Sequence, residues 1–255
     1  MFFYGFQEIT GNSKLHYHLH QDELCIEEHL NSFEDLLKHL VEGKPIQHFF
    51  GWAGFCGLKI LVNHQVLIPR PETEELVNLI YQDLKERDTL KVLDLGTGSG
   101  CISLALKNQL PQAKIKGVDL SDPALEMARK SAKINSLNVD FEKLNILNES
   151  FGLDEDVWVS NPPYIPEREA KEMEEHVINH EPKMALFAPG DPLIFYRKII
   201  DQASLHPKNL SVYFEVHYSL GHEVFKLMKN KGLEDVELLM DGFGKPRMLR
   251  GKKIL

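Results

Sequence analysis

The sequence of 255 residues lacks the features that mark several protein classes. Its three cysteines, Cys25, Cys56 and Cys101, have no paired or CxxC spacing, which argues against a disulfide framework or a zinc site and favours a reducing compartment. No apolar run approaches the ~18 residues that suggest a transmembrane helix. The opening MFFYGFQEIT carries no basic segment of a secretion signal. We therefore expect a cytoplasmic protein without a membrane anchor.

The sequence also has fewer basic than acidic residues. The net charge of −9 disfavours stable binding of nucleic acid by neutralisation of its backbone, because that mode relies on an excess of Lys and Arg. Hydrophobic residues make up 43% and charged residues 26%, which is the composition of a globular protein with a sizeable core. A chain of this length forms either one large domain or a main domain with a small appendage, and we expect the second.

Residues 1–68 differ in pattern from the rest and are predicted to form an N-terminal substrate-recognition module. Within residues 2–20, two runs flank Gly11, and LHYHLH alternates apolar residues with histidines, which predicts a hairpin. A strand there would place three histidines on one side, namely His16, His18 and His20. No Cys or carboxylate at matching spacing supports a metal site, so we interpret them as a solvated strand face.

Two further patterns complete this module. The apolar spacing in residues 22–40 predicts two short helices that break near Asn31, the second beginning with a capping box of Ser32 and Asp35. Residues 46–68 are rich in Phe, Gly, Val, Ile and Leu, with glycines as punctuation, and predict a second hairpin.

Residues 69–255 alternate strand and helix patterns. The helix in LIPRPETEELV is predicted to begin at Thr73. Strands are predicted at 92–95, 115–119, 139–144, 157–160, 211–216 and 237–240, and helices at 99–108, 123–135, 193–204 and 221–229. Such alternation predicts a mostly parallel sheet covered on both faces, with ligands bound beyond the carboxyl ends of its strands.

Three other segments have structural interpretations. The basic tail KPRMLRGKKIL is predicted to be an edge strand whose cations improve solubility and block edge pairing. KEMEEH, residues 171–176, is predicted to be a solvated helix face. Glu215 and His217, in FEVHY, end a strand near the expected cleft and are interpreted as structural.

The stretch VLDLGTGSGCISLAL predicts a strand, a glycine turn and a helix. Its spacing is G-x-G-x-G, unlike the G-x-G-x-x-G of dinucleotide enzymes, and no Walker lysine follows. Asp119 ends the next strand, where a carboxylate can accept both ribose hydroxyls. Asp94 would repel a pyrophosphate but suits a ligand with an amino group or a positive charge, and S-adenosylmethionine carries both. The alternative is a tight turn whose glycines relieve crowding, with Asp119 capping the next helix.

The stretch VWVSNPPYIP leaves an apolar strand through two prolines. Proline fixes φ and removes the backbone N–H, so the carbonyls here are not drawn into an ordinary helix or ladder and can accept other donors. The alternative is a rigid turn in which Asn161 caps the backbone and Tyr164 is half-buried.

Together these motifs resemble a known family. DLGTGSG, the VD at 118–119 and SNPPY look like the seven-stranded methyltransferases that modify planar nitrogen. LIPRPETEELV, EPKMAL and DGFGKPR add a resemblance to the protein-(glutamine-N5) methyltransferases of class 1 release factors, the PrmC/HemK family. The match extends from Gly43 to Arg247. The resemblance implies an α/β fold, with a seven-stranded Rossmann-like sheet that binds S-adenosylmethionine after a small N-terminal module.

The resemblance also implies roles for individual residues. In the NPPY motif, Asn161 and the carbonyl of Pro162 would each accept one hydrogen of the substrate amide, Pro163 would prevent a competing donor, and Tyr164 would pack against the flat amide or seal the pocket. The residues that would contact the cofactor are Gly96, Thr97, Gly98, Ser99 and Gly100 around the methionine part, Asp119 at the ribose, Asn145 and Ile146 at the adenine, and Asn161. The family usually has Asp-Trp at the position of Asn145-Ile146, which predicts a looser adenine clamp here. Thr73, Leu67 and Arg70 match a family segment that folds over the reaction centre.

The implied substrate is the glutamine of the GGQ motif in class 1 translation release factors. We expect a monomer that binds this protein partner, no metal, no membrane and no stable nucleic-acid complex. NPPY alone is shared with amino-methyltransferases of RNA and DNA, so a nucleobase is the alternative substrate. A non-catalytic, methyltransferase-like binding subunit is the other alternative.

Overall fold

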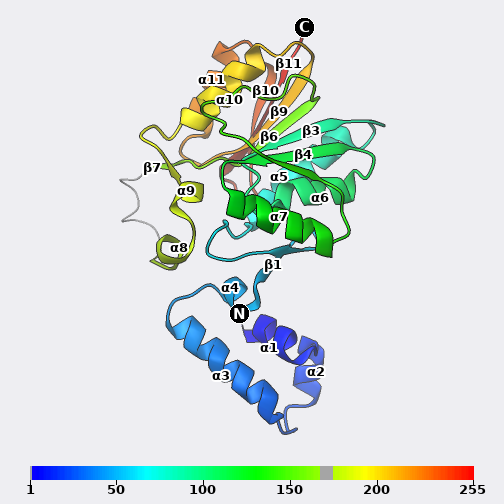
Figure 1. Ribbon diagram of the computed structural model, residues 1–255, viewed down its shortest axis with the longest axis vertical. Coiled ribbons are helices and arrows are strands. Elements are labelled where there is room, and N and C mark those ends of the chain that lie inside the picture. The colour runs from blue at the N-terminus through cyan, green and yellow to red at the C-terminus, as the bar shows by residue number, and fades with distance from the viewer. Residues whose placement is uncertain (1, 167–174) are drawn as a thin grey trace.

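The computed structural model describes residues 2–166 and 175–255. A group of helices near the N-terminus lies at one end of the molecule, and a layered α/β domain forms the rest (Figure 1). Within the described residues, no helix is both long and apolar enough to cross a membrane.

The N-terminal twenty residues form two helices, so the predicted hairpin is wrong. The helices are α1 (Phe2–Thr10) and α2 (Lys14–Leu19), and the Ser13 hydroxyl caps α2 by accepting from the His16 N–H. Tyr17 lies 5.1 Å from Phe6, ring centre to ring centre, which supplies the tertiary contact that a short helix needs. His16 and His20 stack as helical neighbours at 4.0 Å, so there is no strand face of three histidines. Among the described residues, no group of His, Cys, Asp and Glu could hold a metal ion.

Residues 27–41 form one helix, α3 (Glu27–Val41), where two had been predicted. The Ser32 hydroxyl donates to the Glu28 carbonyl 3.0 Å away, a bond made inside a helix, so Ser32 caps nothing. Leu36 is the buried residue of α3 and packs against Gly5 of α1. A short helix, α4 (Ile46–Phe50), follows.

The second hairpin, predicted within residues 46–68, is confirmed as β1 (Trp52–Phe55) and β2 (Leu58–Leu61), which pair antiparallel. The predicted start of this hairpin is wrong, because residues 46–50 form the helix α4. Its two turn residues, Cys56 and Gly57, both have positive φ, as a tight hairpin turn requires. The hairpin packs on the α/β domain, because Phe55 and Ile60 belong to that domain's core. In addition, the Leu61 N–H donates to the Ser131 hydroxyl at 2.9 Å.

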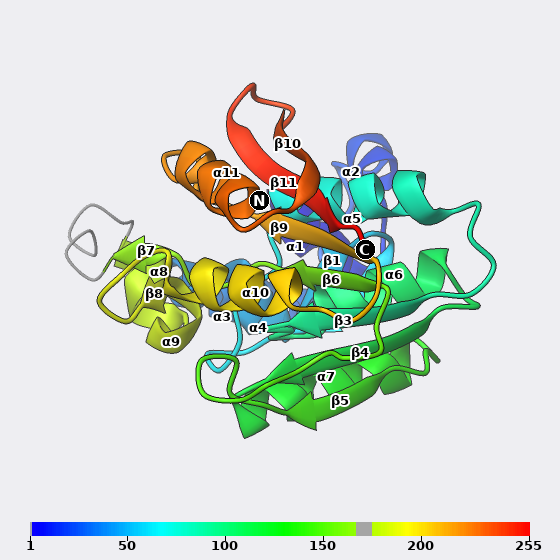
Figure 2. The same ribbon diagram turned by 90° about the horizontal axis from the view of Figure 1, so that it is seen from above.

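The seven-stranded sheet confirms the predicted fold class. Its order is β10-β11-β9-β6-β3-β4-β5, and Figure 2 shows the strands in this succession. β11 is antiparallel to both neighbours, and the other pairs are parallel. The strands are β3 (Lys91–Leu95), β4 (Lys114–Asp119), β5 (Asp140–Lys143), β6 (Val157–Ser160), β9 (Leu210–Glu215), β10 (Glu234–Met240) and β11 (Pro246–Lys253). The basic tail was predicted to be an edge strand; β11 instead lies inside the sheet, because β10 covers it.

Helices cover both faces of the sheet. The helices α5 (Pro71–Leu84), α6 (Cys101–Gln109) and α7 (Asp122–Ile134) share one core with Val157 and Val159 of β6. The helices α10 (Ile194–Ser204) and α11 (Gly221–Asn230) share the other with Trp158. Successive residues of a strand therefore enter opposite cores. α5 begins at Pro71 instead of the predicted Thr73, because proline suits the first helical turn.

The segment between β6 and α10 contains short elements. They are β7 (Ile165–Pro166), α8 (Glu175–His180), α9 (Lys183–Leu186) and β8 (Phe187–Ala188). β7 and β8 pair with each other in parallel. The predicted solvated face at residues 171–176 lies outside the described residues, apart from the backbone of its last two.

Candidate active site

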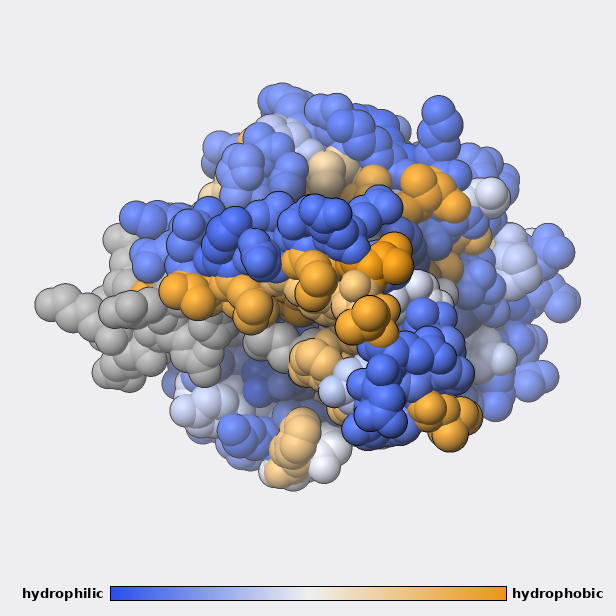
Figure 3. Space-filling view, turned by 90° about the horizontal axis from the view of Figure 1, so that it is seen from below, coloured by the Kyte–Doolittle hydropathy of each residue, from blue (hydrophilic) through white to orange (hydrophobic). Residues whose placement is uncertain are grey.

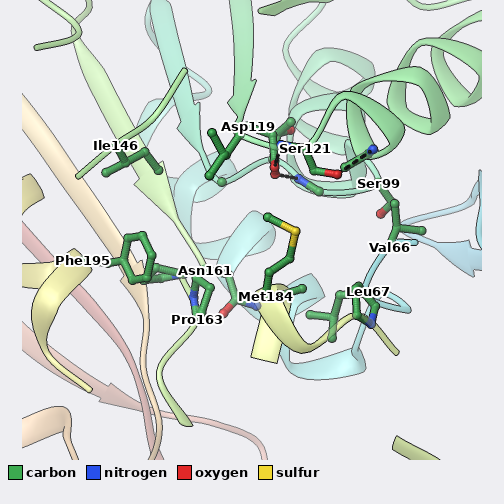
Figure 4. Close-up of a pocket in the computed structure, with 18 of the residues that line it drawn as sticks. Val66, Leu67, Ser99, Asp119, Ser121, Ile146, Asn161, Pro163, Met184 and Phe195 are labelled. Atoms are coloured by element: carbon green, nitrogen blue, oxygen red, sulfur yellow. Dashed lines mark hydrogen bonds between the residues drawn. The ribbon is translucent and has the colours of Figure 1, made fainter. Parts of the chain in front are cut away.

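A cavity of about 720 Å³ lies beyond the carboxyl ends of β3, β4 and β6, where ligands of parallel sheets bind. Figure 4 shows side chains from several segments around it, with Asp119 and Ser121 on one side and Asn161 and Pro163 on another. Of the predicted site residues, those that line this cavity are Leu67, Arg70, Thr73, Gly96, Thr97, Gly98, Ser99, Asp119, Asn145, Ile146, Asn161, Pro162 and Pro163. Gly100 and Tyr164 are not among its lining residues.

The glycine loop takes its shape from backbone hydrogen bonds to the neighbouring strand. The N–H groups of Gly96 and Thr97 both donate to the Val118 carbonyl at 2.9 Å. Gly98 has a φ of +55°, which glycine adopts without strain, and its N–H donates to Asp119. Gly100 serves packing instead, because a Cβ there would lie 2.9 Å from the Ala128 Cβ of α7. The loop is thus open to the cavity at Gly98 and closed against a helix at Gly100.

The Asp119 carboxylate ties the loop to the end of β4. One oxygen accepts from the Gly98 N–H at 2.8 Å and the other from the Ser121 N–H at 2.9 Å. Burial raises the pKa of Asp119, and these backbone hydrogen bonds oppose that rise. A carboxylate has about four acceptor sites, so Asp119 keeps acceptor capacity for a ligand's hydroxyl groups.

Asp94 lies inside the protein and organises the loop from behind. It is fully buried and accepts from the Thr97 hydroxyl at 2.6 Å and the Ser103 hydroxyl at 2.7 Å. Burial raises its pKa to about 6. It does not line the cavity, contrary to the expectation that it meets the charged part of a ligand. Its effect on a ligand is therefore exerted through the loop.

The loop after β5 forms an apolar side of the cavity. Ile146 lies there, and Figure 4 shows Phe195 of α10 nearby. The Asn145 side chain accepts from the Leu147 N–H at 3.1 Å, so it stabilises the turn that presents Ile146. An apolar wall of this kind suits the flat face of a heterocyclic base.

The NPPY motif divides between two cavities. Ser160 anchors its start by donating from its hydroxyl to the Leu95 carbonyl at 2.6 Å. Asn161 and Pro162 line both the main cavity and a neighbouring one of about 190 Å³. Tyr164 lines only the smaller cavity, with its ring 5.7 Å from the His217 ring. Tyr164 thus lies behind the asparagine as seen from the main cavity.

Two buried carboxylates lie beside this motif. Glu215, at the end of β9, accepts from the Thr73 hydroxyl at 2.7 Å, and the Asn161 amide nitrogen lies 3.4 Å from the same hydroxyl oxygen. Glu181 accepts from the Ile68 N–H at 3.0 Å and from the Arg70 guanidinium at 2.6 Å. Glu181 therefore joins the proline-rich segment before α5 to the segment before α9.

Comparison with known proteins identifies the family. The family model described as Methyltransferase small domain matches residues 72–225. The chain is 41% identical over 227 residues to the release factor glutamine methyltransferase of Flavobacterium psychrophilum, which covers 87% of this chain and 80% of that protein. It is 40% identical over 235 residues to the protein of the same name from Lactococcus lactis, with 90% and 85% covered. A methyltransferase structure from Pyrococcus furiosus shares the fold, with a TM-score of 0.56 at 19% identity over 78% of this chain and 90% of that one.

The chain belongs to the release factor glutamine methyltransferase family. The resemblance inferred from its motifs is thereby confirmed, and the protein is a methyltransferase. LIPRPETEELV and EPKMAL are two of the segments that pointed to this family among the methyltransferases. They contribute Leu67 and Met184 to the main cavity.

Sequence reasoning missed several residues of this methyltransferase site. Phe195 belongs to an ordinary helical pattern, so nothing in the sequence separates it from a core residue. Glu215 was interpreted as structural, although a carboxylate within the apolar strand LSVYFE was a usable signal. Glu181 is the first residue of EPKMAL, and only the tertiary structure shows that it is buried.

Proposed function

We propose that this methyltransferase transfers the methyl group of S-adenosylmethionine to the side-chain amide nitrogen of the glutamine in the GGQ motif of class 1 release factors. The observation that carries the proposal is the position of Asn161 and Pro162, which face the cavity lined by the glycine loop and Asp119. Family membership supports the choice of substrate.

The cavity offers groups that match S-adenosylmethionine. The loop at Gly96–Ser99 would hold the methionine part, and the free acceptor sites of Asp119 would bind the ribose hydroxyls. Ile146 and Phe195 would flank the adenine. When bound, the cofactor supplies an electrophilic methyl group on a sulfonium centre. Gly100 would contribute only by fixing the loop against α7.

The substrate amide needs help from the protein because its nitrogen is a poor nucleophile. Its lone pair is delocalised into the carbonyl, so the reaction depends on orientation and on stabilisation of the positive charge that develops on nitrogen. The Asn161 side-chain oxygen and the Pro162 carbonyl would each accept one N–H of the amide. Pro163 has no N–H to compete for these acceptors. The nitrogen becomes acidic during the transfer, so no strong base is required beforehand.

The N-terminal module offers a surface for a protein partner. Figure 3 shows apolar side chains gathered on the side of the molecule where the N-terminal helices lie. Exposed apolar residues of this region include Leu24, Ile26, Leu30, Leu37 and Val41. A patch of this kind suits association with a folded protein, and the net charge of −9 does not favour nucleic acid. We expect a monomer that acts in the cytoplasm, where release factors work.

The test is methyl transfer from labelled S-adenosylmethionine to purified release factors. The factors are supplied in natural form and with the GGQ glutamine replaced, beside purified ribosomal RNA and DNA. We expect label in the natural factors alone. Label in RNA or DNA with none in the factors would replace the proposed substrate by a nucleobase. Label that survives the loss of the glutamine would keep the reaction and reject the site. Absence of S-adenosylmethionine binding would favour a non-catalytic subunit.

A further inference from the structure

Three polar side chains form a chain of contacts that leads away from the reaction centre. They come from three segments, Asn161 after β6, Thr73 in α5 and Glu215 in β9. The Thr73 hydroxyl lies 2.7 Å from a Glu215 carboxylate oxygen and 3.4 Å from the Asn161 amide nitrogen. Thr73 and Glu215 are each only 2% exposed. Burying an ionisable group beside an active site is costly, so its contacts call for a functional explanation.

The donor and acceptor properties of these groups determine which group donates in each of the two contacts. A carboxylate can only accept, so the single hydrogen of the Thr73 hydroxyl goes to Glu215. The hydroxyl oxygen is then left as an acceptor, which selects the NH₂ arm of Asn161 and excludes the oxygen arm. The two arms of a planar amide point apart, so the Asn161 oxygen is turned away from Thr73. Hydrogen bonds within active sites often tighten only in the reacting complex, so a distance of 3.4 Å at Asn161 is compatible with this role.

We propose that Glu215 is a positioning residue for methyl transfer, which acts through the Thr73 hydroxyl to hold the Asn161 amide with its oxygen toward the substrate amide. This inference rests on the proposed function. A flipped Asn161 would present its NH₂ group to the substrate NH₂, donor against donor, and the substrate nitrogen would lose an acceptor. Glu215 and Thr73 would themselves touch neither the transferred methyl group nor the nitrogen.

The surroundings of Glu215 make this arrangement sensitive to its charge. Burial raises the pKa of Glu215 to about 7, and the Thr73 hydrogen bond, the nearby Arg247 and, to a smaller extent, the Asn161 amide limit the rise. A protonated Glu215 could donate to the Thr73 oxygen, which would free the Thr73 hydrogen for the oxygen arm of Asn161. Other ionisable groups also face Glu215. They are the carboxyl group of Glu72 on α5, the thiol of Cys101 on α6, and the hydroxyl groups of Tyr164 after β6 and Tyr196 on α10.

The experiment measures kcat and KM for release factor, and the affinity for S-adenosylmethionine, in the full-length protein. The decisive pair is Thr73→Val, which keeps the shape but removes the hydroxyl, and Thr73→Ser, which keeps the hydroxyl. Glu215→Gln removes the charge with little change in shape, and Asn161→Ala sets the largest loss expected from this chain. Each variant is followed across the pH range around 7 in which Glu215 titrates.

We expect Thr73→Val and Glu215→Gln to lower kcat about tenfold, with cofactor affinity and KM for the release factor unchanged. Thr73→Ser should keep most of the activity. The double variant should be no slower than either single one, because both changes break the same chain. The rise of kcat with pH that accompanies Glu215 ionisation should be missing in Glu215→Gln.

Three results would overturn the inference: wild-type kcat in a folded Thr73→Val protein, additive losses in the double variant, or a pH profile that Glu215→Gln leaves unchanged. If Glu215→Gln does not fold, the comparison of Thr73→Val with Thr73→Ser still tests the inference. Failure of the proposed function looks different, because the wild-type protein itself would then leave the release factor unlabelled.

Discussion

At Asp119, one carboxylate holds the glycine loop and faces the cavity. It accepts from the Gly98 and Ser121 N–H groups while it lines the site. Asp119→Ala would remove both acceptors and the proposed ribose contact. We expect affinity for S-adenosylmethionine to fall by about 1–3 kcal/mol, measured by titration calorimetry. Asp119→Asn, which keeps one acceptor oxygen, should lose less. Unchanged affinity in the alanine variant would remove Asp119 from the cofactor site.

Asp94 gives a prediction about pH and stability. Burial raises its pKa from the ordinary 3.8 to about 6, so between these values the folded protein retains a proton that the unfolded chain releases. The free energy of unfolding therefore falls as pH rises through this window, by an amount on the order of 3 kcal/mol from this group. The amide of Asp94→Asn does not titrate in this window, so this position no longer contributes a pH dependence to the free energy of unfolding.

Urea unfolding at several pH values checks this difference. The stability of Asp94→Asn relative to the wild type should increase as pH rises from about 4 to 6, whatever the constant cost of its altered hydrogen bonds. Thr10→Val, which removes a hydroxyl that donates to the Phe6 carbonyl, is the control and should differ from the wild type by the same amount throughout. A pH-independent difference for Asp94→Asn would contradict the burial argument.

At the scale of elements, the glycine loop packs against helix α7 at Gly100 and faces the cavity at Gly98. A Cβ on Gly100 would lie 3.3 Å from the Ala128 backbone of α7. In addition, the backbone at this position has a φ of +80°, which is unfavourable for residues other than glycine. Gly100→Ala should therefore destabilise the fold by roughly 2–5 kcal/mol, since strain and overpacking add. Gly98→Ala has open space around its Cβ and should cost only about 1–2 kcal/mol of strain.

The two alanine variants should thus separate folding from binding. Thermal unfolding should show the larger loss for Gly100→Ala, whereas calorimetric titration should show the larger loss of cofactor affinity for Gly98→Ala, whose methyl group enters the cavity. Equal effects of both variants on stability and on affinity would mean that the loop does not have two separate roles.

At the scale of the whole molecule, the protein consists of a catalytic sheet domain and helices that expose apolar residues. Leu30 and Leu37 lie on one side of α3 and are 49% and 60% exposed. If this surface holds the release factor, Leu30→Glu and Leu37→Glu should each raise KM for the factor at least roughly fivefold, because a charge would enter an apolar contact. Cofactor affinity should not change.

Steady-state kinetics with the intact release factor checks this prediction. Leu205→Glu is the matched control, because Leu205 follows α10 and is 82% exposed outside the N-terminal module. The control should keep the wild-type KM. An equal rise in KM for all three variants would indicate a general effect of added negative charge, and the proposed docking surface would then be rejected.

The sequence alone determined the features that depend on local pattern. Alternating apolar runs predicted the parallel part of the sheet and its helices, because period and length distinguish a buried strand from an amphipathic helix. The glycine loop, Asp119 and NPPY pointed to the cofactor and the reaction, because each chemical requirement is met within a few consecutive residues. Six residues of LHYHLH were too few to separate the two periods, and contact with α1 made them helical.

Only the tertiary structure decided which polar residues reach the site and which support it. Asp94 and Asp119 both lie near the carboxyl ends of neighbouring strands, yet one is enclosed by Thr97 and Ser103 and the other faces the cavity. Thr73 and Glu215 are 142 positions apart, and Ile68 and Glu181 are 113 apart. No local period carries information across such distances. These contacts exist because packing of helices and loops on the sheet brings the segments together, and burial then requires each polar group to find a partner.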